Sequence, residues 1–545
     1  MIEDFFRPDL RAMDFYKINS DKVGLYGILF PNGDSRTKID LSTARALELE
    51  LFGESILPKP ITHVGNVVLK SSILAPKRNV DVIRAKQNAI RILENNQELR
   101  DKIDNLLRCV QINEVSATSY WNNSIWGSER DKSILSLREL VSDTIDLTKK
   151  IPKSDSKYIN QLLEKIISVE SSGIDKLSRT NVCRQGMKII SEKDVEFFSE
   201  FPLMRNTLSD YRLLPAVIFG STIGLMIGGF TYIETVNSSL SIGTSLAFTG
   251  IFSLLSSRFF AALEKNKVLP YLFKKYEKDV GIQDMFHSVG SLDELLTLTK
   301  FGIQLEENGI PRCMPEIVDD RKHYIELRDL TNLITSLDTS YIRSKEFMLN
   351  HNIHFLTGPN SGGKTTNAKA SQHIQILAQM GSYVPASYAK VVPASRLFYQ
   401  VGENDKQSGS EGGYGAGLQR NKNVLTLADS LSYAIVDDLI DGTDPEQTLR
   451  DAMRQFYGLA HTGANVVFLT HKHQLVDQFK NQTGKGNYLM VEFDGDTPTR
   501  QIIYGISHDS KGDLVSRRVG MDQLGMETLL RERGCLALGQ SLYDL

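Results

Sequence analysis

Apolar residues recur at spacings of three and four along much of the first half of the chain. The run from 80 to 110 has this pattern with charged residues between, and so do the runs 134–149 and 158–169. That period is typical of amphipathic helices, so residues 76–317 are predicted to form a mainly helical core and lever. Residues 1–75 mix short apolar runs with turn residues and predict a small α/β region.

The pattern changes near residue 318, where short apolar runs begin to alternate with helical ones. Residues 354–357, 433–436 and 465–470 read as buried strands. This alternation is typical of an α/β domain, predicted for 318–510, and a helical tail is predicted for 511–545. The fold class is therefore α+β and multidomain, with a helical core and lever joined to an α/β domain.

One window of the chain is almost without charge. Residues 213–257 contain a single charged residue, Glu234, whereas charged residues make up 24% of the whole chain. The first arm, 213–233, would span roughly 31 Å as a helix, which matches the hydrocarbon core of a bilayer. Its glycines Gly220, Gly224 and Gly228 lie on one helical face, where a second helix can approach closely in lipid. The window therefore predicts a membrane hairpin.

Basic residues flank this window on both sides, from Lys193 to Arg212 and from Arg258 to Lys275. Both ends of the hairpin are thus predicted to lie in the cytoplasm, which puts the protein at the cytoplasmic membrane with its α/β domain in the cytoplasm. The alternative is a cytoplasmic protein in which the window forms a buried helical hairpin or an apolar tip that docks on a partner.

Composition limits the remaining classes of function. The chain has 545 residues, 63 Lys plus Arg and 66 Asp plus Glu, so its formal net charge is −3. This balance argues against a surface that is basic throughout for nucleic acid, and a polyanion would have to meet a local patch. The 4 cysteines lie far apart without a CxxC spacing, which indicates reduced thiols and neither bridges nor zinc ligands.

A phosphate-binding loop follows the strand at 354–357. The motif consists of Gly358, Pro359, Asn360, Ser361, Gly362, Gly363, Lys364, Thr365 and Thr366. It satisfies the pattern G-x-x-x-x-G-K-[ST] and precedes a helical run, so backbone N–H groups can turn toward a phosphate at a helix start. Lys364 would reach the β- and γ-phosphates of ATP, and Thr365 would ligate Mg²⁺.

Two later strands end in polar residues of the kind that such a site needs. Asp437 ends the strand at 433–436 and is predicted to hold Mg²⁺, and Asp438 is predicted to orient an attacking water. His471 follows the strand at 465–470, at the strand end where ligands collect in open α/β sheets. We interpret it as a sensor of the γ-phosphate. Two acids at a strand end can also form a solvated turn.

Residues 318–530 resemble the ATPase domain of the MutS family, which is an ABC-type ATPase. The motifs that carry the resemblance are the Walker A motif at 358–366 with Asn360, the segment GSYVPA at 381–386, the Walker B motif and D-loop at 432–443, and the switch histidine at 471. Residues 72–103 also resemble the start of the MutS core domain. The resemblance covers about two thirds of the chain and implies a homodimer in which ATP is closed between two subunits.

The sequence departs from the family pattern in four places. Asp438 stands where the family has Glu, and its carboxylate is one methylene shorter, so slow hydrolysis is expected. The signature region falls at 408–414, where a glycine-rich segment could contact the partner's γ-phosphate through Ser410 or could be a flexible loop. The first 70 residues are too few for the family's mismatch-reading domain. The apolar window 213–257 stands where the family has its DNA clamp.

These features predict a MutS-like ATPase that binds and hydrolyses ATP with Mg²⁺ and acts as a conformational switch, anchored in a membrane. One alternative is a soluble DNA-binding ATPase of mismatch repair or recombination. DNA is a possible partner by resemblance, although no basic patch with interleaved aromatic residues is seen. The other alternative is a membrane-tethered scaffold that binds ATP with little hydrolysis.

Overall fold

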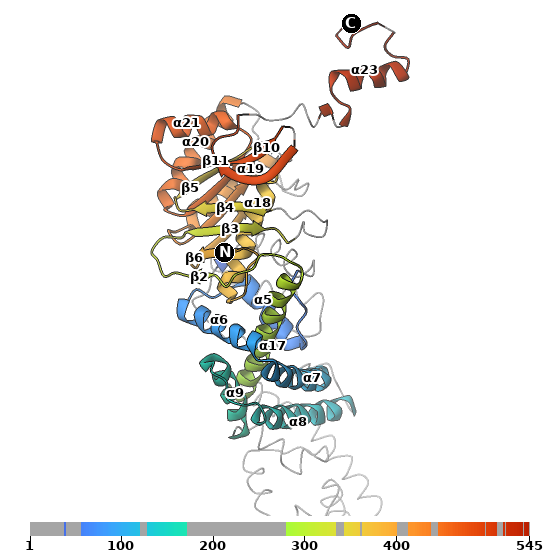
Figure 1. Ribbon diagram of the computed structural model, residues 1–545, viewed down its shortest axis with the longest axis vertical. Helices are drawn as coiled ribbons and strands as arrows, with labels where there is room; N and C mark the ends of the chain where they lie inside the picture. The colour runs from blue at the N-terminus through green and yellow to red at the C-terminus, as the bar shows by residue number, and fades with distance from the viewer. Residues whose placement is uncertain are drawn as a thin grey trace, which may run out of the picture.

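Two parts of different architecture make up the computed structural model of the chain (Figure 1). A helical part lies at one end and an α/β part with two sheets lies at the other, so the mixture of helices and sheets in the predicted α+β class is confirmed. The limits predicted for the domains stay predictions. The structure describes residues 38–39, 56–119, 128–171, 280–333, 343–359, 362–400, 412–437, 445–495, 497–508, 516–517, 519–537 and 539–543.

The helical part is organised around one long helix. Its described elements are α5 (His63–Leu74), α6 (Val80–Asn95), α7 (Gln97–Ser119), α8 (Ser128–Lys149), α9 (Lys157–Ser168), the 3₁₀ turn η2 (Val169–Ser171) and α17 (Val280–Glu307). Helix α17 packs against α5, α6, α7 and α9. Its Leu292, Leu295 and Phe301 are buried together with Ile83 and Ile90 of α6. The apolar face of each helix thus closes on a common core.

Sequence analysis predicted one continuous helical run from 80 to 110, but the structure has two helices there, α6 and α7. Asn96 separates α6 from α7 with φ −124° and ψ 89°, which is not helical. Its side-chain oxygen accepts a hydrogen bond from Leu99 N at 2.9 Å and so caps the start of α7. Apolar residues keep the same spacing on both sides of Asn96, so the hydrophobic pattern does not reveal the break. The pair Asn95-Asn96 could have indicated it, because asparagine is a common residue at helix ends.

Two buried carboxylates hold the start of α5. Asp293 on α17 accepts hydrogen bonds from Thr62 N and Thr62 Oγ1, both at 2.7 Å, and Glu114 on α7 accepts one from His63 N at 2.7 Å. The first N–H groups of a helix carry partial positive charge, so these carboxylates stabilise the helix start and join three helices. Burial raises the pKa of Asp293 above its usual range. A Cβ at Gly65 would lie 2.1 Å from Asp293 Oδ2, so glycine leaves room for this carboxylate.

A buried ion pair connects α6 to α17. Lys86 Nζ lies 2.8 Å from Glu294 Oε2, and the two side chains are only 3% and 2% exposed. Burial, and then the nearby negative charge of Glu294, raise the pKa of the Tyr158 hydroxyl on α9. Taking a charge out of water is costly unless an opposite charge compensates it. Each member of this pair therefore depends on the other to remain in the interior.

The α/β part contains a larger and a smaller sheet. The strands are β1 (Lys38–Ile39), β2 (Glu316–Ile317), β3 (Ile325–Thr331), β4 (Arg343–Leu349), β5 (Ile353–Thr357), β6 (Tyr388–Val391), β7 (Arg396–Gln400), β8 (Tyr433–Asp437), β9 (Asn465–Thr470), β10 (Asn487–Asp494) and β11 (Thr497–Tyr504). The larger sheet has the order β1-β7-β8-β9-β5-β10-β11, and the smaller has the order β2-β6-β3-β4. The buried strands predicted at 354–357, 433–436 and 465–470 are confirmed as β5, β8 and β9.

Glutamine side chains fix the helix that follows β5. The described helices of this part are α18 (Lys364–Met380), α19 (Gly412–Leu427), α20 (Pro445–Thr462) and α21 (His473–Thr483), with α23 (Gln523–Glu532) beyond them. Helix α18 is buried along most of its length. Gln372 Nε2 donates to Phe398 O at 2.8 Å, and Gln375 Nε2 donates to Val392 O at 3.0 Å. These bonds satisfy buried amides and tie the helix to β7 and to the residue that follows β6.

The far end of α18 reaches the helical part. Gln379 Nε2 donates to Lys77 O at 2.8 Å, just before α6. The helix ends at Gly381 with φ 81°, and a Cβ there would lie 2.9 Å from Lys86 Cβ. Glycine thus provides both the left-handed cap and the close approach. One rigid helix therefore runs from the end of β5 to α6.

The apolar window 213–257, predicted as a membrane hairpin, lies outside the described residues. In the part of the chain that is described, no helix combines the length and the apolar character needed to cross a bilayer. The membrane hairpin therefore stays a prediction.

Candidate functional site

The carboxyl ends of three strands meet at one edge of the larger sheet. Strands β5, β9 and β8 are parallel neighbours in that order. Thr357 at the end of β5 pairs with Thr470 at the end of β9, and Asp437 at the end of β8 pairs with Leu469. The segments that follow these strands are therefore brought together, as expected for ligand sites in open α/β sheets.

The loop after β5 is packed closely against β10. Gly358 has φ 142°, and a Cβ there would lie 3.4 Å from Val491 Cβ. A Cβ at Gly362 would lie 3.2 Å from Pro359 O and 3.3 Å from Val491 Cγ1. Gly362 N donates to Pro359 O at 3.0 Å, which closes a turn, and Gly363 at φ 92° leads into α18. Gly358 and Gly363 have positive φ angles that favour glycine, and Gly362 leaves room for the close approach of Pro359 O and Val491.

Lys364 is the first residue of α18 and is buried, with 4% of its surface exposed. Its Nζ donates hydrogen bonds to Gly358 O at 2.7 Å and to Pro359 O at 2.9 Å. The side chain thus curls back toward the loop, at the helix start where phosphates bind in loops of this kind. This is the geometry expected of a lysine that binds a nucleotide phosphate.

A threonine and an aspartate from distant parts of the chain meet beside this loop. Thr365 Oγ1 donates a hydrogen bond to Asp437 Oδ2 at 2.8 Å, although 72 residues separate the two in sequence. A hydroxyl and a carboxylate are hard oxygen donors, and Mg²⁺ in nucleotide sites takes one or two such protein ligands together with phosphate oxygens and water. The residues present therefore fit Mg²⁺, and Thr365 and Asp437 would hold it.

The first turn of α18 is supported by two asparagines that sequence analysis did not single out. Asn332 Nδ2 donates to Thr366 O at 2.9 Å, and Asn367 Nδ2 donates to Gly363 O at 3.0 Å. Asn367 is 1% exposed, and a buried amide of this kind needs a partner. A polar residue on the buried face of a helix was the available signal for Asn367, whereas no local pattern points to Asn332.

The other residues proposed from sequence divide into two groups. His471 directly follows β9 and is half-buried, so it lies at the same edge of the sheet as the loop. Four residues lie outside the described part of the chain, namely Asn360, Ser361, Ser410 and Asp438. Their roles stay predictions.

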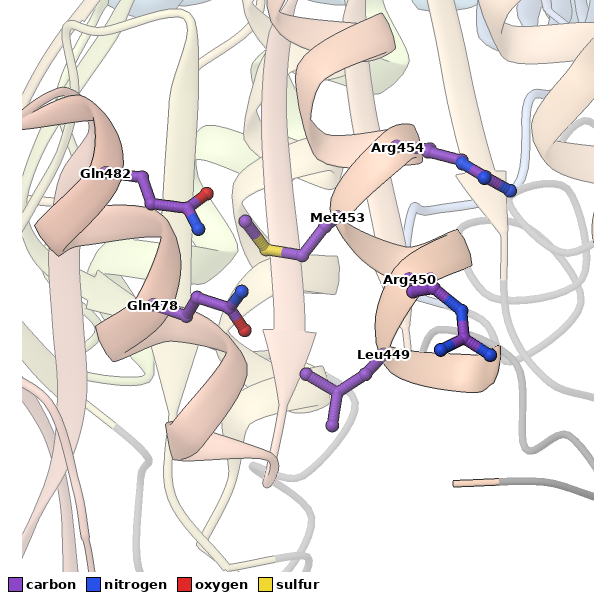
Figure 2. Close-up of a pocket in the computed structure, with 6 residues that line it drawn as sticks. All are labelled: Leu449, Arg450, Met453, Arg454, Gln478 and Gln482. Atoms are coloured by element: carbon purple, nitrogen blue, oxygen red, sulfur yellow. The ribbon is translucent and has the colours of Figure 1, made fainter. Parts of the chain in front are cut away.

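A pocket of about 280 Å³ lies elsewhere, between α20 and α21. It is lined by Leu449, Arg450, Met453, Arg454, Gln478 and Gln482 (Figure 2). Its two arginines point away from Gln478 and Gln482, and they form ion pairs with Glu446 and Asp451 on their own helix. The pocket therefore offers no free cation for a phosphate, and it shares no lining residue with the phosphate loop.

Comparison with known proteins supports the MutS family. The family model "MutS domain V" matches residues 354–522, a range that includes Lys364, Asp437 and His471. A "DNA mismatch repair protein MutS" from Methanothrix thermoacetophila is 24% identical over 86% of this chain and 58% of its own length. The protein of the same name from Persephonella marina is 24% identical over 90% of this chain and 60% of its own length.

A third relative gives a shorter match. The "DNA mismatch repair protein MutS" of Acetivibrio thermocellus is 30% identical over 38% of this chain and 25% of its own length. The chain spans about three fifths of the length of the first two relatives. The resemblance expected from the motifs thus extends over most of this chain, while part of each relative has no counterpart in it.

Proposed function

We propose that this chain binds ATP with Mg²⁺, hydrolyses it and uses the nucleotide as a conformational switch. The observation that carries the proposal is the contact of Thr365 Oγ1 with Asp437 Oδ2 at 2.8 Å, beside a loop that Lys364 Nζ covers. A hydroxyl, a carboxylate and an ammonium group at the start of one helix are the set that holds a Mg²⁺-bound triphosphate. The similarity to MutS proteins supports the same function.

Each residue has a distinct role in this proposal. Lys364 neutralises charge on the β- and γ-phosphates, where negative charge increases during transfer to water. Thr365 and Asp437 hold Mg²⁺, which when bound withdraws charge from the phosphate oxygens. His471 contacts the γ-phosphate from the end of β9. Asp438 orients the attacking water, and its short side chain favours slow turnover.

An Asp437→Asn variant tests this site. We expect its Mg²⁺-dependent ATP hydrolysis to fall about 100-fold, because the amide keeps the shape of the carboxylate but loses the charge that binds the metal. Phosphate release at several Mg²⁺ concentrations measures the effect. Asp494→Asn, at an exposed position on β10 of the same sheet, is the matched control and should hydrolyse ATP at the original rate. Equal loss in both variants, or in neither, would contradict the proposal.

The contacts of α18 support a switch that acts on the helical part. The helix starts at Lys364 in the proposed nucleotide site and ends at Gly381 against Lys86 of α6. Its position is thus constrained by the nucleotide at one end and by the helical part at the other. A change at the phosphate loop that moves α18 also moves the contact with α6, and this contact is the element through which we propose that the switch acts.

The relatives' printed names support duplex DNA as the partner of this switch. We propose that DNA binding is coupled to the nucleotide state, through a local patch because the net charge is −3. Anisotropy of a labelled duplex, measured across a salt series with and without ATP, tests the coupling. Binding should weaken steeply as salt increases and should change with ATP. Absence of binding at low salt would remove DNA from the proposal.

Exposed apolar side chains near the C-terminus support a homodimer. They are Val519, Met521, Leu524, Leu529 and Tyr543, which are between 52% and 74% exposed. Helix α23, which carries two of them, lies apart from the sheets in Figure 1. Large apolar side chains that are left exposed can be covered by a second subunit, which is the contact that we propose for them. Light scattering over a range of concentrations tests the dimer, and a monomer at every concentration would exclude it.

The matches to mismatch repair proteins favour a DNA-directed ATPase over a membrane-anchored one. Membrane anchoring through 213–257, with or without hydrolysis, is therefore not part of the proposed function. Fractionation of membranes washed with carbonate remains the direct measurement for that segment, because a spanning hairpin resists the wash.

A further inference from the structure

The phosphate loop lies between two flanks of the larger sheet. Strands β9 and β8 lie on one side of β5, and strands β10 and β11 lie on the other. The first side supplies Asp437 and His471. The second side supplies a basic residue, Arg500 on β11, for which neither the motifs nor the proposed function assigns a role.

Arg500 lies in a β-bulge. Strands β10 and β11 pair regularly from Leu489 opposite Tyr504 to Val491 opposite Ile502, and pairing resumes with Phe493 opposite Pro498. Arg500 lies in the interrupted stretch with φ 62°, a left-handed conformation that is unfavourable for a residue with a long side chain. Bulges redirect side chains next to active sites, and strained residues gather at ligand-binding positions. The strain at Arg500 therefore calls for a compensating function.

The redirected residue lies against the first turn of α18. Arg500 Cγ is 3.9 Å from the position that a Cβ would take at Gly363. Asn367 Nδ2 donates to Arg500 O at 3.4 Å and to Gly363 O at 3.0 Å, so it bridges β11 and the loop. The side chain of Arg500 is thus held beside the backbone that would surround the phosphates.

The charge of Arg500 is not used elsewhere in the described part of the chain. The nearby carboxylate of Glu492 accepts a hydrogen bond from Thr499 Oγ1 at 2.8 Å, which stabilises the bulge itself. Among the described residues, no carboxylate forms an ion pair with the Arg500 guanidinium. A half-buried guanidinium is a strong donor to an anion, because its planar fork matches two phosphate oxygens.

We propose that Arg500 binds the α-phosphate end of the nucleotide, an inference that rests on the proposed function. With the γ-phosphate turned toward Asp437 and His471, a triphosphate that crosses the start of α18 brings its α-phosphate toward β11. Arg500 then contacts a part that ATP and ADP share. It increases the affinity for both nucleotides and leaves the hydrolytic step to the residues on the opposite flank.

An Arg500→Gly variant separates this role from a structural one. Glycine adopts φ 62° without strain, so the melting temperature should stay the same or rise. Calorimetric titration with ADP, and with ATPγS and Mg²⁺, should show about tenfold weaker binding of both, which corresponds to about 1.4 kcal/mol. In steady-state hydrolysis, KM should rise about tenfold while kcat stays within about twofold. Arg500→Lys, which keeps the charge, should recover part of the affinity.

Lys345→Ala is the matched control, because it removes an exposed positive charge from the neighbouring strand β4 and should leave both affinities unchanged. Unaltered ADP affinity in Arg500→Gly would overturn the inference while the proposed function stands. Weaker binding together with a lower melting temperature would assign Arg500 a structural role and would also overturn it. If the unaltered, folded chain bound neither nucleotide, the proposed function itself would fail.

Discussion

A Lys364→Ala variant is expected to hydrolyse ATP at least about 100-fold more slowly than the unaltered chain. The ammonium group lies directly on the loop, with hydrogen bonds to Gly358 O and Pro359 O at 2.7 and 2.9 Å. In the proposed reaction it stabilises charge on the phosphates where that charge increases, so its removal lowers kcat more than it raises KM. Phosphate release under saturating ATP measures the change.

Lys369→Ala on the same helix is the control for this experiment. Lys369 lies 5.2 Å from the centre of the Tyr399 ring and outside the phosphate loop, so its removal should leave ATP turnover close to the original value. Melting curves of both variants show whether each is folded. Equal turnover in Lys364→Ala and in the unaltered chain would mean that hydrolysis does not occur at this loop, and it would remove catalysis from the proposed function.

A Lys86→Ala variant is expected to lower the free energy of unfolding by about 3–5 kcal/mol. The reason is that the substitution leaves the buried carboxylate of Glu294 without its partner. Glu294 lies 2.8 Å from Lys86 Nζ and is 2% exposed, so without the lysine a carboxylate stays in the interior with no opposite charge. Urea unfolding followed by circular dichroism measures the loss as a lower midpoint at an unchanged slope.

Two controls make this result specific. The double variant Lys86→Met with Glu294→Leu replaces both charges by apolar groups of similar volume, and it should recover most of the lost stability. Lys102→Ala breaks the exposed pair with Glu98 on α7 and should leave the stability nearly unchanged, because water screens exposed charges. A double variant as unstable as the sum of the single ones would show that the ion pair is not the origin of the effect.

The parts of the fold that sequence analysis predicted correctly depend on short stretches of chain. The phosphate loop with its strand and helix is recognisable because its residues are consecutive, and β8 and β9 because each is a short apolar run. The break at Asn96 was missed because the apolar period continues through it. Pairs such as Thr62 with Asp293 were also missed, since 231 residues separate them and no local pattern encodes the contact.

In the candidate site, too, the residues next to a motif were predicted and those brought in from distant parts of the chain were missed. Lys364 and Thr365 follow from the motif, and Asp437 from its place at a strand end. Arg500 could not be found in this way, because its position depends on a bulge between two antiparallel strands and on the packing of β10 beside β5. Sequence analysis thus identifies residues that are neighbours of a motif along the chain. It misses residues that become neighbours of the motif only when the sheet forms.

The glutamines along α18 limit the kinds of movement that this helix can make. Gln372 and Gln375 each bond a particular carbonyl oxygen, at 2.8 and 3.0 Å, and both are buried. Sliding the helix by one residue, about 1.5 Å along its axis, would break these bonds in a place that water does not reach. Helix α18 therefore cannot act as a piston inside its own domain. Any displacement that begins at the phosphate loop has to carry the sheets with it, and it reaches α6 through the close contact at Gly381.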